Sequence, residues 1–431
     1  MEKSIEIHHV TRVEGHGNIV VKISDGKVKE VEWQVSEAPR FFESIVKGQH
    51  YSDIPKIASR ICGICSIGHT IASIKAVEDA FSVDITEQTL ILRKLALHAE
   101  NMQSHILHIG FLALPDLFGE GSVIGLVKSG HKDLVNKVLS IHKLANEFSD
   151  LICGRTTHPI SMVVGGFTSI PSKKSLLNMR DRIEREMNTV IKLADEINKK
   201  KDNFPDFSRE TEYIALSTED EYAFYDGLIT STDTGVCRED YTKIIEEYVV
   251  PQSTAKYTKH ARDSYMVGAL ARFNINYSLL KPLAKDIAKT LDIKPICYNP
   301  FMNTLAQLVE IAHNMEESID LIDLVVDDLK EESIPEIKIK ACRGVGMAEV
   351  PRGLLIHDYT FNEKGRCERA NMIIPTNQNH ANIQKDMESF LPTIADKPSS
   401  HIELAMEMLV RAYDPCISCS THTLKVKVEK K

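Results

Sequence analysis

The chain has 431 residues, of which 43% are hydrophobic and 26% are charged, a composition typical of globular proteins. Its formal net charge of −9 argues against nucleic acid as a main partner, because phosphate binding requires a positive surface. No apolar run approaches the length that spans a bilayer, and the first residues contain no apolar core of a signal peptide. We therefore expect a cytoplasmic protein with no direct membrane span.

Strands are expected first, followed by helices. Residues 18–24 and 27–35 alternate apolar and polar side chains, and Asp25 and Gly26 between them are a strong hairpin signal. Three later segments repeat apolar residues at steps of three and four, which predicts helices packed along one face, as in a bundle. These segments are residues 91–109, 176–197 and 305–329.

Strands return late in the chain. Residues 354–361 and 366–374 flank a probable turn at 362–365, and a last helix is expected over 401–412, before Pro415, which cannot extend it. The prediction is a mainly α protein: a helical-bundle core with small β lobes near the N- and C-terminal parts.

We expect a single domain, because the sequence contains no internal repeat, low-complexity tract or obvious linker. Its parts would be an N-terminal β lobe, a helical core, a β lobe with a C-terminal cysteine segment, and a tail. The expected bounds are 1–50, 51–340, 341–422 and 423–431.

The chain has nine cysteines, and this odd number in a chain of ordinary size argues against a disulfide framework. Four of them form two Cys-x-x-Cys pairs, Cys62 with Cys65 and Cys416 with Cys419. We interpret the other five as small buried hydrophobic residues. They are Cys153, Cys237, Cys297, Cys342 and Cys367.

Each pair could bring two thiolates to one metal ion, so the two pairs could supply four sulfurs. A structural zinc site is one interpretation, but zinc modules usually keep both pairs within some tens of residues, and most of the chain separates Cys65 from Cys416. A redox dithiol would explain one pair and not both. The spacing favours a shared metal site, and it does not choose among zinc, copper(I), nickel and an iron–sulfur cluster.

The sequence around both pairs resembles the two signature segments of nickel–iron hydrogenase large subunits. These are Arg-Ile-Cys-Gly-Ile-Cys-Ser-Ile-Gly-His at 60–69 and Asp-Pro-Cys-Ile-Ser-Cys-Ser-Thr-His at 414–422. Four further segments resemble other motifs of the family in the same order, so the likeness runs over nearly the whole chain. They are residues 11–16, 41–48, 349–353 and 373–376. The resemblance implies the large-subunit fold and reversible oxidation of dihydrogen to protons and electrons.

The same resemblance implies the metal ligands. Cys62, Cys65, Cys416 and Cys419 would bind nickel, and Cys65 and Cys419 would also bind an iron that carries carbonyl and cyanide ligands. Metal-bound thiols are deprotonated, so these ligands would form an electron-rich site.

The resemblance also implies catalytic residues. Cys416 would take the proton released from dihydrogen, and Glu14 would relay it outward, as a carboxylate of raised pKa can. Arg352 would overhang the open metal positions as a fixed cation. The alternatives are a surface salt bridge for Glu14 and a structural ion pair for Arg352.

A second, hard ion is implied near the C-terminus, with Glu43, His422 and the backbone carbonyl of Met372 as ligands. Carboxylate and carbonyl oxygens suit magnesium, and the imidazole leaves iron as an alternative. His69 is expected to support the first cysteine loop through a hydrogen bond rather than to bind metal.

Two features depart from the common family pattern. Ser104 stands where many members have aspartate, and in having serine here the chain resembles the soluble multi-subunit branch of the family. Residues 423–431 follow His422 and are either an extension removed during maturation or a retained tail.

Two competing functions remain: a non-catalytic relative like the quinone-site subunit of NADH:quinone oxidoreductase, which lacks the cysteine ligands, and a four-cysteine zinc protein. No remaining cysteine cluster is spaced for iron–sulfur ligation, so electrons would leave through an iron–sulfur small subunit. Further partners would be a heterodisulfide reductase, deazaflavin or NAD(P) module, of which we favour the first.

Overall fold

The computed structural model describes residues 2–24 and 27–421, and it begins with a three-stranded antiparallel sheet. The predicted strands are confirmed as β2 (Gly17–Ser24) and β3 (Lys27–Val35), and β1 (Glu2–Ile7) pairs with β2. The predicted hairpin turn at Asp25 and Gly26 lies outside the described residues. Alternate side chains of β2 are buried, because one face of this sheet packs on the helices over residues 375–394 and 399–412.

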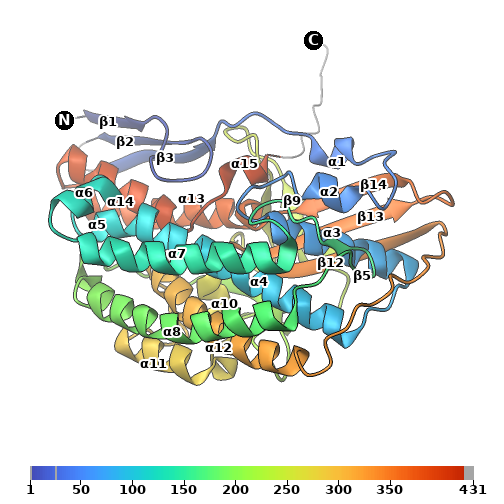
Figure 1. Cartoon of the computed structure of the whole chain (residues 1–431). Helices are drawn as coiled ribbons and strands as arrows, with labels where there is room; N and C mark the ends of the chain where they lie inside the picture. The colour runs from blue at the N-terminus through green and yellow to red at the C-terminus, as the bar shows by residue number, and fades with distance from the viewer. Residues whose placement is uncertain (1, 25–26, 422–431) are drawn as a thin grey trace, which may run out of the picture.

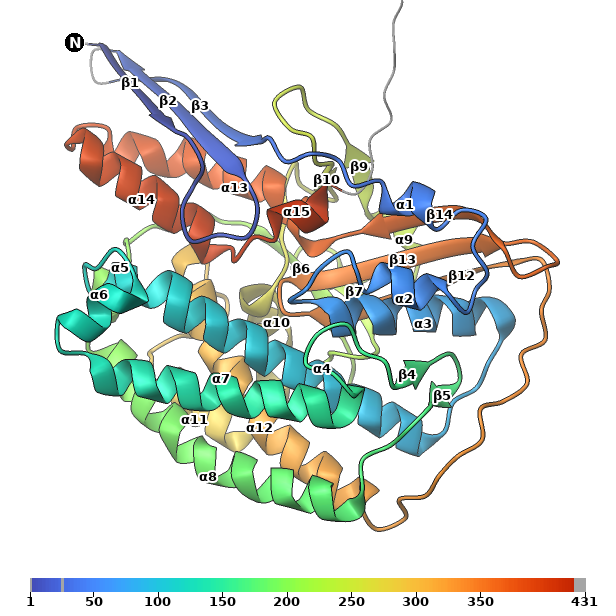
Figure 2. The same cartoon turned by 45° about the horizontal axis from the view of Figure 1, so that its top comes forward.

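Long helices form the centre of the molecule, and they lie side by side in Figures 1 and 2. The three predicted helices are confirmed as α4 (Glu87–Leu107), α8 (Lys173–Asn198) and α12 (Asn303–Val325). A fourth, α7 (Lys132–Cys153), packs between α4 and α8. α12 is buried on most of its surface, so its apolar residues surround the helix instead of forming one stripe.

A second antiparallel sheet lies beside helix α3 (Ser66–Phe81). Its strands are β12 (Cys342–Val350), β13 (Gly353–Phe361) and β14 (Cys367–Ile373), and the last two confirm the late strands that the sequence predicted. β12 approaches α3 closely because it has glycine at position 346, where a Cβ would collide with the backbone oxygen of Ala72. This contact fixes α3, and the cysteine loop before it, against the sheet.

Short strands also occur where the sequence predicted only helix. A four-stranded sheet has the order β11-β6-β7-β8, and two ribbons pair β4 with β5 and β9 with β10. Most of these strands have two to four residues, too few to show an alternating pattern, and the six residues of β6 do not alternate because both of its faces are buried. Their bounds are β4 Met162–Val163, β5 Gly166–Phe167, β6 Glu212–Ser217, β7 Leu228–Ser231, β8 Gly235–Val236, β9 Glu246–Tyr248, β10 Tyr257–Lys259 and β11 Tyr265–Met266.

The chain ends with α13 (Pro375–Ile394), α14 (Ser399–Ala412) and α15 (Ile417–Ser420). α14 confirms the predicted last helix. Figure 2 shows α15 beside the loop that joins β1 to β2, and the backbone N–H of Ile417 donates to the carbonyl of Glu14 at 2.9 Å. Segments near both ends of the described chain are therefore hydrogen-bonded to each other.

Smaller helices connect these elements. They are α1 Phe42–Ile45, α2 Ile54–Ala58, α5 Leu114–Leu117, α6 Val123–Lys128, α9 Tyr241–Ile244, α10 Ala269–Asn276 and α11 Pro282–Thr290, with the π-helical turn His108–Ala113 after α4. With 48% helix and 18% strand, the mainly α prediction is confirmed. Within residues 2–24 and 27–421, no helix is both long enough and apolar enough to cross a membrane.

Candidate metal centre

The two cysteine pairs lie together in the folded chain. Cys62 and Cys65 end the loop before α3, and Cys416 and Cys419 lie at the start of α15 and within it. The sulfurs of Cys62, Cys416 and Cys419 all lie within 4.8 Å of one another, and all four cysteines are 5% exposed or less. The fold therefore brings sulfurs from both ends of the chain to one buried place.

Cys65 lies at the edge of this group and faces Arg352. Its sulfur accepts a hydrogen bond from Arg352 Nη1 at 3.3 Å, and its backbone N–H donates to the sulfur of Cys62 at 3.2 Å. The side-chain hydrogen bond with Cys65 lowers the pKa of Cys62, whereas the same contact, together with burial, raises the pKa of Cys65. Metal binding would displace the thiol protons of both residues.

The sulfurs of Cys416 and Cys419 are in contact with each other. A metal centre would bind both as thiolates. The sulfur of Cys419 also lies 3.7 Å from the carbonyl oxygen of Ile61, in the loop of the first pair. Both sulfurs of the second pair thus face the first cysteine loop.

The chemistry of the donors fits a nickel–iron centre. In the described part of the chain, the one group of three or more potential ligands within reach of a single ion consists of sulfurs alone. Soft thiolates suit nickel, zinc, copper(I) or iron–sulfur chemistry, and they do not suit magnesium or calcium. The long separation of the pairs in sequence excludes a local zinc knuckle.

Glu14 contacts the second cysteine pair. Its Oε2 accepts hydrogen bonds from the thiol of Cys416 and from the backbone N–H of Ser418, both at 3.1 Å, and its Oε1 accepts from the hydroxyl of Ser418. The residue is half-buried. Its carboxylate therefore joins the buried sulfur to the surface loop that carries His16, whose ring contacts Glu37 at 2.7 Å.

Arg352 is buried and fixed from three sides. Its Nη2 donates to Asp414 Oδ1 at 2.8 Å, and its Nη1 contacts the hydroxyl of Ser104 at 3.4 Å, besides the sulfur of Cys65. Although burial opposes the charge, Asp414 and the nearby thiols raise the pKa of Arg352. The guanidinium is thus a permanent cation beside the cysteines.

Sequence reasoning missed the residues that hold this cation. Gln307 of α12 donates to the second carboxylate oxygen of Asp414 at 3.1 Å, and its own oxygen lies 2.5 Å from His108 Nδ1. Asp414 could have been found, because it precedes Pro415 in the second cysteine motif. Gln307 and His108 gave no signal, because each lies inside a helical segment.

Part of the expected second ion site lies together. Glu43, 6% exposed, accepts a hydrogen bond from the backbone N–H of Met372 at 3.0 Å. His422, the third expected ligand, lies outside the described residues. The ammonium of Lys256 is 3.5 Å from the same Glu43 oxygen and 3.1 Å from Glu247. Lys256 therefore already supplies positive charge at this carboxylate.

The remaining sequence interpretations have mixed outcomes. His69 Nδ1 lies 3.1 Å from His357 Nε2, a contact that ties α3 to β13. Of the five cysteines interpreted as buried, two are buried and three are partly exposed, so that interpretation was wrong for the three. The buried ones are Cys153 and Cys367, and the partly exposed ones are Cys237, Cys297 and Cys342.

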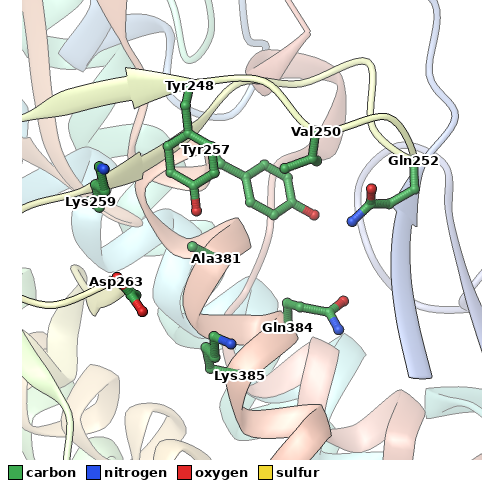
Figure 3. Close-up of a pocket in the computed structure, with 9 residues that line it drawn as sticks. All are labelled: Tyr248, Val250, Gln252, Tyr257, Lys259, Asp263, Ala381, Gln384 and Lys385. Carbon is green, nitrogen blue, oxygen red and sulfur yellow. The ribbon is translucent and has the colours of Figure 1, made fainter. Parts of the chain in front are cut away.

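A separate pocket of about 360 Å³ lies between the ribbon of β9 and β10 and helix α13 (Figure 3). Figure 3 shows the rings of Tyr248 and Tyr257 on one side and Gln384 and Lys385 of α13 on the other. None of the four paired cysteines lines it. This pocket is therefore separate from the cysteine site.

Comparison with known proteins defines the class. A family described as nickel-dependent hydrogenase matches residues 40–118 and 217–422, and a family described as HoxL-like matches residues 4–38. The chain belongs to the nickel-dependent hydrogenase family.

Individual relatives extend this likeness along the chain. The alpha chain of sulfhydrogenase 2 from Pyrococcus furiosus is 33% identical over 98% of this chain and 100% of the relative. A vhc-type F420-non-reducing hydrogenase polypeptide of Methanococcus voltae is 31% identical over 97% and 95%. The crystal structure of an NAD⁺-reducing [NiFe]-hydrogenase in the H2-reduced state superposes with a TM-score of 0.86 at 25% identity, covering 97% of this chain and 99% of the other.

These findings confirm the predicted family, fold and activity. The chain is the catalytic large subunit of a hydrogenase, an oxidoreductase that acts on dihydrogen, and the family implies a nickel–iron centre and partner subunits. The quinone-site relative and the zinc protein are set aside, because the likeness to hydrogenase subunits covers nearly the whole chain.

Proposed function

We propose that Cys62, Cys65, Cys416 and Cys419 hold the nickel, and that Cys65 and Cys419 also hold an iron with carbonyl and cyanide ligands. The observation that carries this proposal is the convergence of sulfurs from both chain ends within 4.8 Å in a buried place. When bound, the centre supplies the uneven cleavage of dihydrogen into protons and electrons. The protein supplies geometry, a dry surrounding and a route for protons.

The proton leaves through Cys416 and Glu14 in this proposal. The sulfur of Cys416 holds the proton, and the carboxylate of Glu14, 3.1 Å away, accepts it. The N–H and hydroxyl of Ser418 keep that carboxylate pointed at the sulfur. Since Glu14 is half-buried, it can release the proton toward water on its other side.

Arg352 provides a fixed positive charge beside Cys65. Asp414 and Ser104 orient the guanidinium, so it cannot swing away as charge on the sulfurs changes. A preorganised cation in a water-poor site stabilises negative charge more strongly than one in water. Ser104 is neutral, so the carboxylate that forms the ion pair with Arg352 is that of Asp414.

Glu43, the carbonyl of Met372 and His422 would hold a magnesium or iron ion. The contact between Glu43 and the Met372 backbone supports this assignment. The neighbouring ammonium of Lys256 would weaken binding of a cation here through repulsion. The ion would act structurally, tying α1 to β14.

Electrons would leave toward an iron–sulfur small subunit. Gly63, between the first two cysteines, is exposed, and nothing lies within 4 Å of the position that its Cβ would occupy. A partner can therefore approach the backbone of the metal-binding loop directly. Relatives named as F420-non-reducing and NAD-reducing hydrogenases support a further module; we favour a heterodisulfide-reductase-linked, cytoplasmic complex, with deazaflavin or NAD(P) modules as alternatives.

Elemental analysis tests the proposed centre. The chain matured with its partner, then separated from it, should hold nickel and iron near one to one, with one further iron where the second site holds iron instead of magnesium. Cys342→Ser, which changes a partly exposed cysteine outside both pairs, should keep both metals. Zinc alone in an active preparation would refute the proposal.

A further inference from the structure

Helix α3 begins at the metal centre with a residue that cannot cap it. The N-cap position is Cys65, which makes no side-chain cap hydrogen bond. Serine, threonine, aspartate or asparagine usually fill this position, because an oxygen of the side chain accepts from the N–H of the second or third helical residue. A thiol is a weak acceptor, and the sulfur of Cys65 already faces Arg352.

Glu100 of the neighbouring helix α4 supplies the missing cap. Its Oε1 accepts from the N–H of Ile67 at 2.7 Å, and its Oε2 accepts from the N–H of Gly68 at 2.9 Å. These are the second and third residues of α3, which begins at Ser66. Glu100 is 0% exposed, so its carboxylate meets the helix terminus without competition from water.

The packing around this contact leaves little freedom. A Cβ at position 68 would lie 2.9 Å from Glu100 Oε2 and would collide with the side chain of Val350 on β12. Burial raises the pKa of Glu100 to about 8, and the two backbone N–H groups oppose that rise.

We propose that Glu100 is a positioning residue of the metal centre: it caps α3 from α4, which fixes the backbone of Cys65 and leaves its sulfur for the metals. The inference rests on the proposed function, because it assigns Cys65 as a bridging ligand. It adds a residue that touches no reacting atom and acts only through the cysteine loop.

The same arrangement occurs elsewhere in the chain and provides a matched control. Helix α11 has Lys281 at its N-cap, again with no side-chain cap. Glu316 of α12 accepts from the N–H of Leu283 at 2.7 Å and also bonds the N–H of Ala284. Figure 1 shows α11 on the opposite side of the molecule from α15, so loss of this cap should not reach the cysteines.

The test compares Glu100→Ala, Glu100→Gln and Glu316→Ala in the full chain. In the chain before metal loading, Glu100→Ala should speed amide hydrogen exchange at Ile67 and Gly68 by about five-fold, because both donors lose their acceptor. After maturation with the small partner, it should shift the nickel electron paramagnetic resonance spectrum or lower the nickel content. Glu100→Gln restores one acceptor, so its values should lie between those of Glu100→Ala and wild type.

The control should separate the two sites. Glu316→Ala should speed exchange at Leu283 and Ala284 similarly, with the nickel spectrum and content of wild type. A wild-type spectrum and wild-type exchange in Glu100→Ala would overturn the proposal. So would lost turnover with a wild-type spectrum in Glu100→Gln, because that result would make Glu100 a proton carrier. Absence of nickel from the wild-type chain would instead refute the proposed function, even with faster exchange at Ile67 and Gly68.

Discussion

Replacing Glu14 by glutamine should stop proton transfer and leave the fold of the site almost unchanged. The carbonyl oxygen of glutamine can accept from Cys416 and from the N–H of Ser418, as Glu14 Oε2 does, and its amide can donate to the Ser418 hydroxyl. Shape and hydrogen bonds are thus kept, and only the charge is lost. The cost to folding should be about 1 kcal/mol, the difference between a charged and a neutral hydrogen bond.

Turnover should respond far more strongly than stability. An amide cannot accept and release a proton near neutral pH, and loss of a positioned acid–base group typically slows a reaction by about 10²- to 10⁴-fold. Glu14→Gln should keep its metals and the interconversion of ortho- and para-dihydrogen, which needs no proton export. It should lose dihydrogen oxidation and the exchange of deuterium between dideuterium gas and water.

A matched variant tests the neighbouring surface carboxylate. Glu37→Gln changes the group that contacts His16 rather than Cys416, and it should exchange deuterium at the wild-type rate. If Glu14→Gln also exchanges deuterium at the wild-type rate, the relay through Glu14 is refuted. His16 would then be the first residue to replace.

The site and its surroundings support three further predictions. Cys65→Ser or Cys419→Ser should abolish the metal centre, because each would remove a bridging sulfur; full nickel and iron content in either variant would contradict the bridging assignment. Arg352→Lys should keep the metals but slow turnover by about 10²-fold or more, because lysine cannot bond Asp414 and Cys65 together; near-normal dihydrogen oxidation would make the arginine a structural ion pair. Burial lowers the pKa of His313 to about 3, against about 6.5 in the unfolded chain, so only the unfolded state is protonated between these values and stability falls as pH drops through that window. His313→Gln should flatten this dependence by about 1.4 kcal/mol per pH unit in denaturant unfolding, and an unchanged slope would show that His313 does not cause it.

The sequence predicted elements whose pattern repeats over several turns or strand pairs. The stripes that became α4, α8 and α12 and the alternation that became β2 and β3 are long enough to show their period. β8 and β11 have two residues each, too few for any period. Their pairing depends on contacts with distant segments, which a local pattern does not contain.

The candidate site was predictable only where short motifs carried it. The cysteine pairs and Arg352 lie in such motifs, and the structure brings them together. Glu100 and Gln307 are polar residues at buried positions of long helices, and nothing in their neighbours marks them. Their partners are Gly68 and Asp414, and only the packing of the helices shows which backbone or side chain each one meets.

The two cysteine pairs meet at the sulfur cluster, so the cluster closes a loop that contains most of the chain. Bringing together Cys62 and Cys416, 354 positions apart, costs conformational entropy, and that cost grows only slowly with the length of the loop. Metal bound by both pairs would stabilise the closed arrangement. By linkage, prior closure would increase the affinity for metal by the same free energy. Since all four cysteines are 5% exposed or less in the folded chain, we expect metal loading to be easiest before α15 docks. Its docking then completes both the fold and the centre.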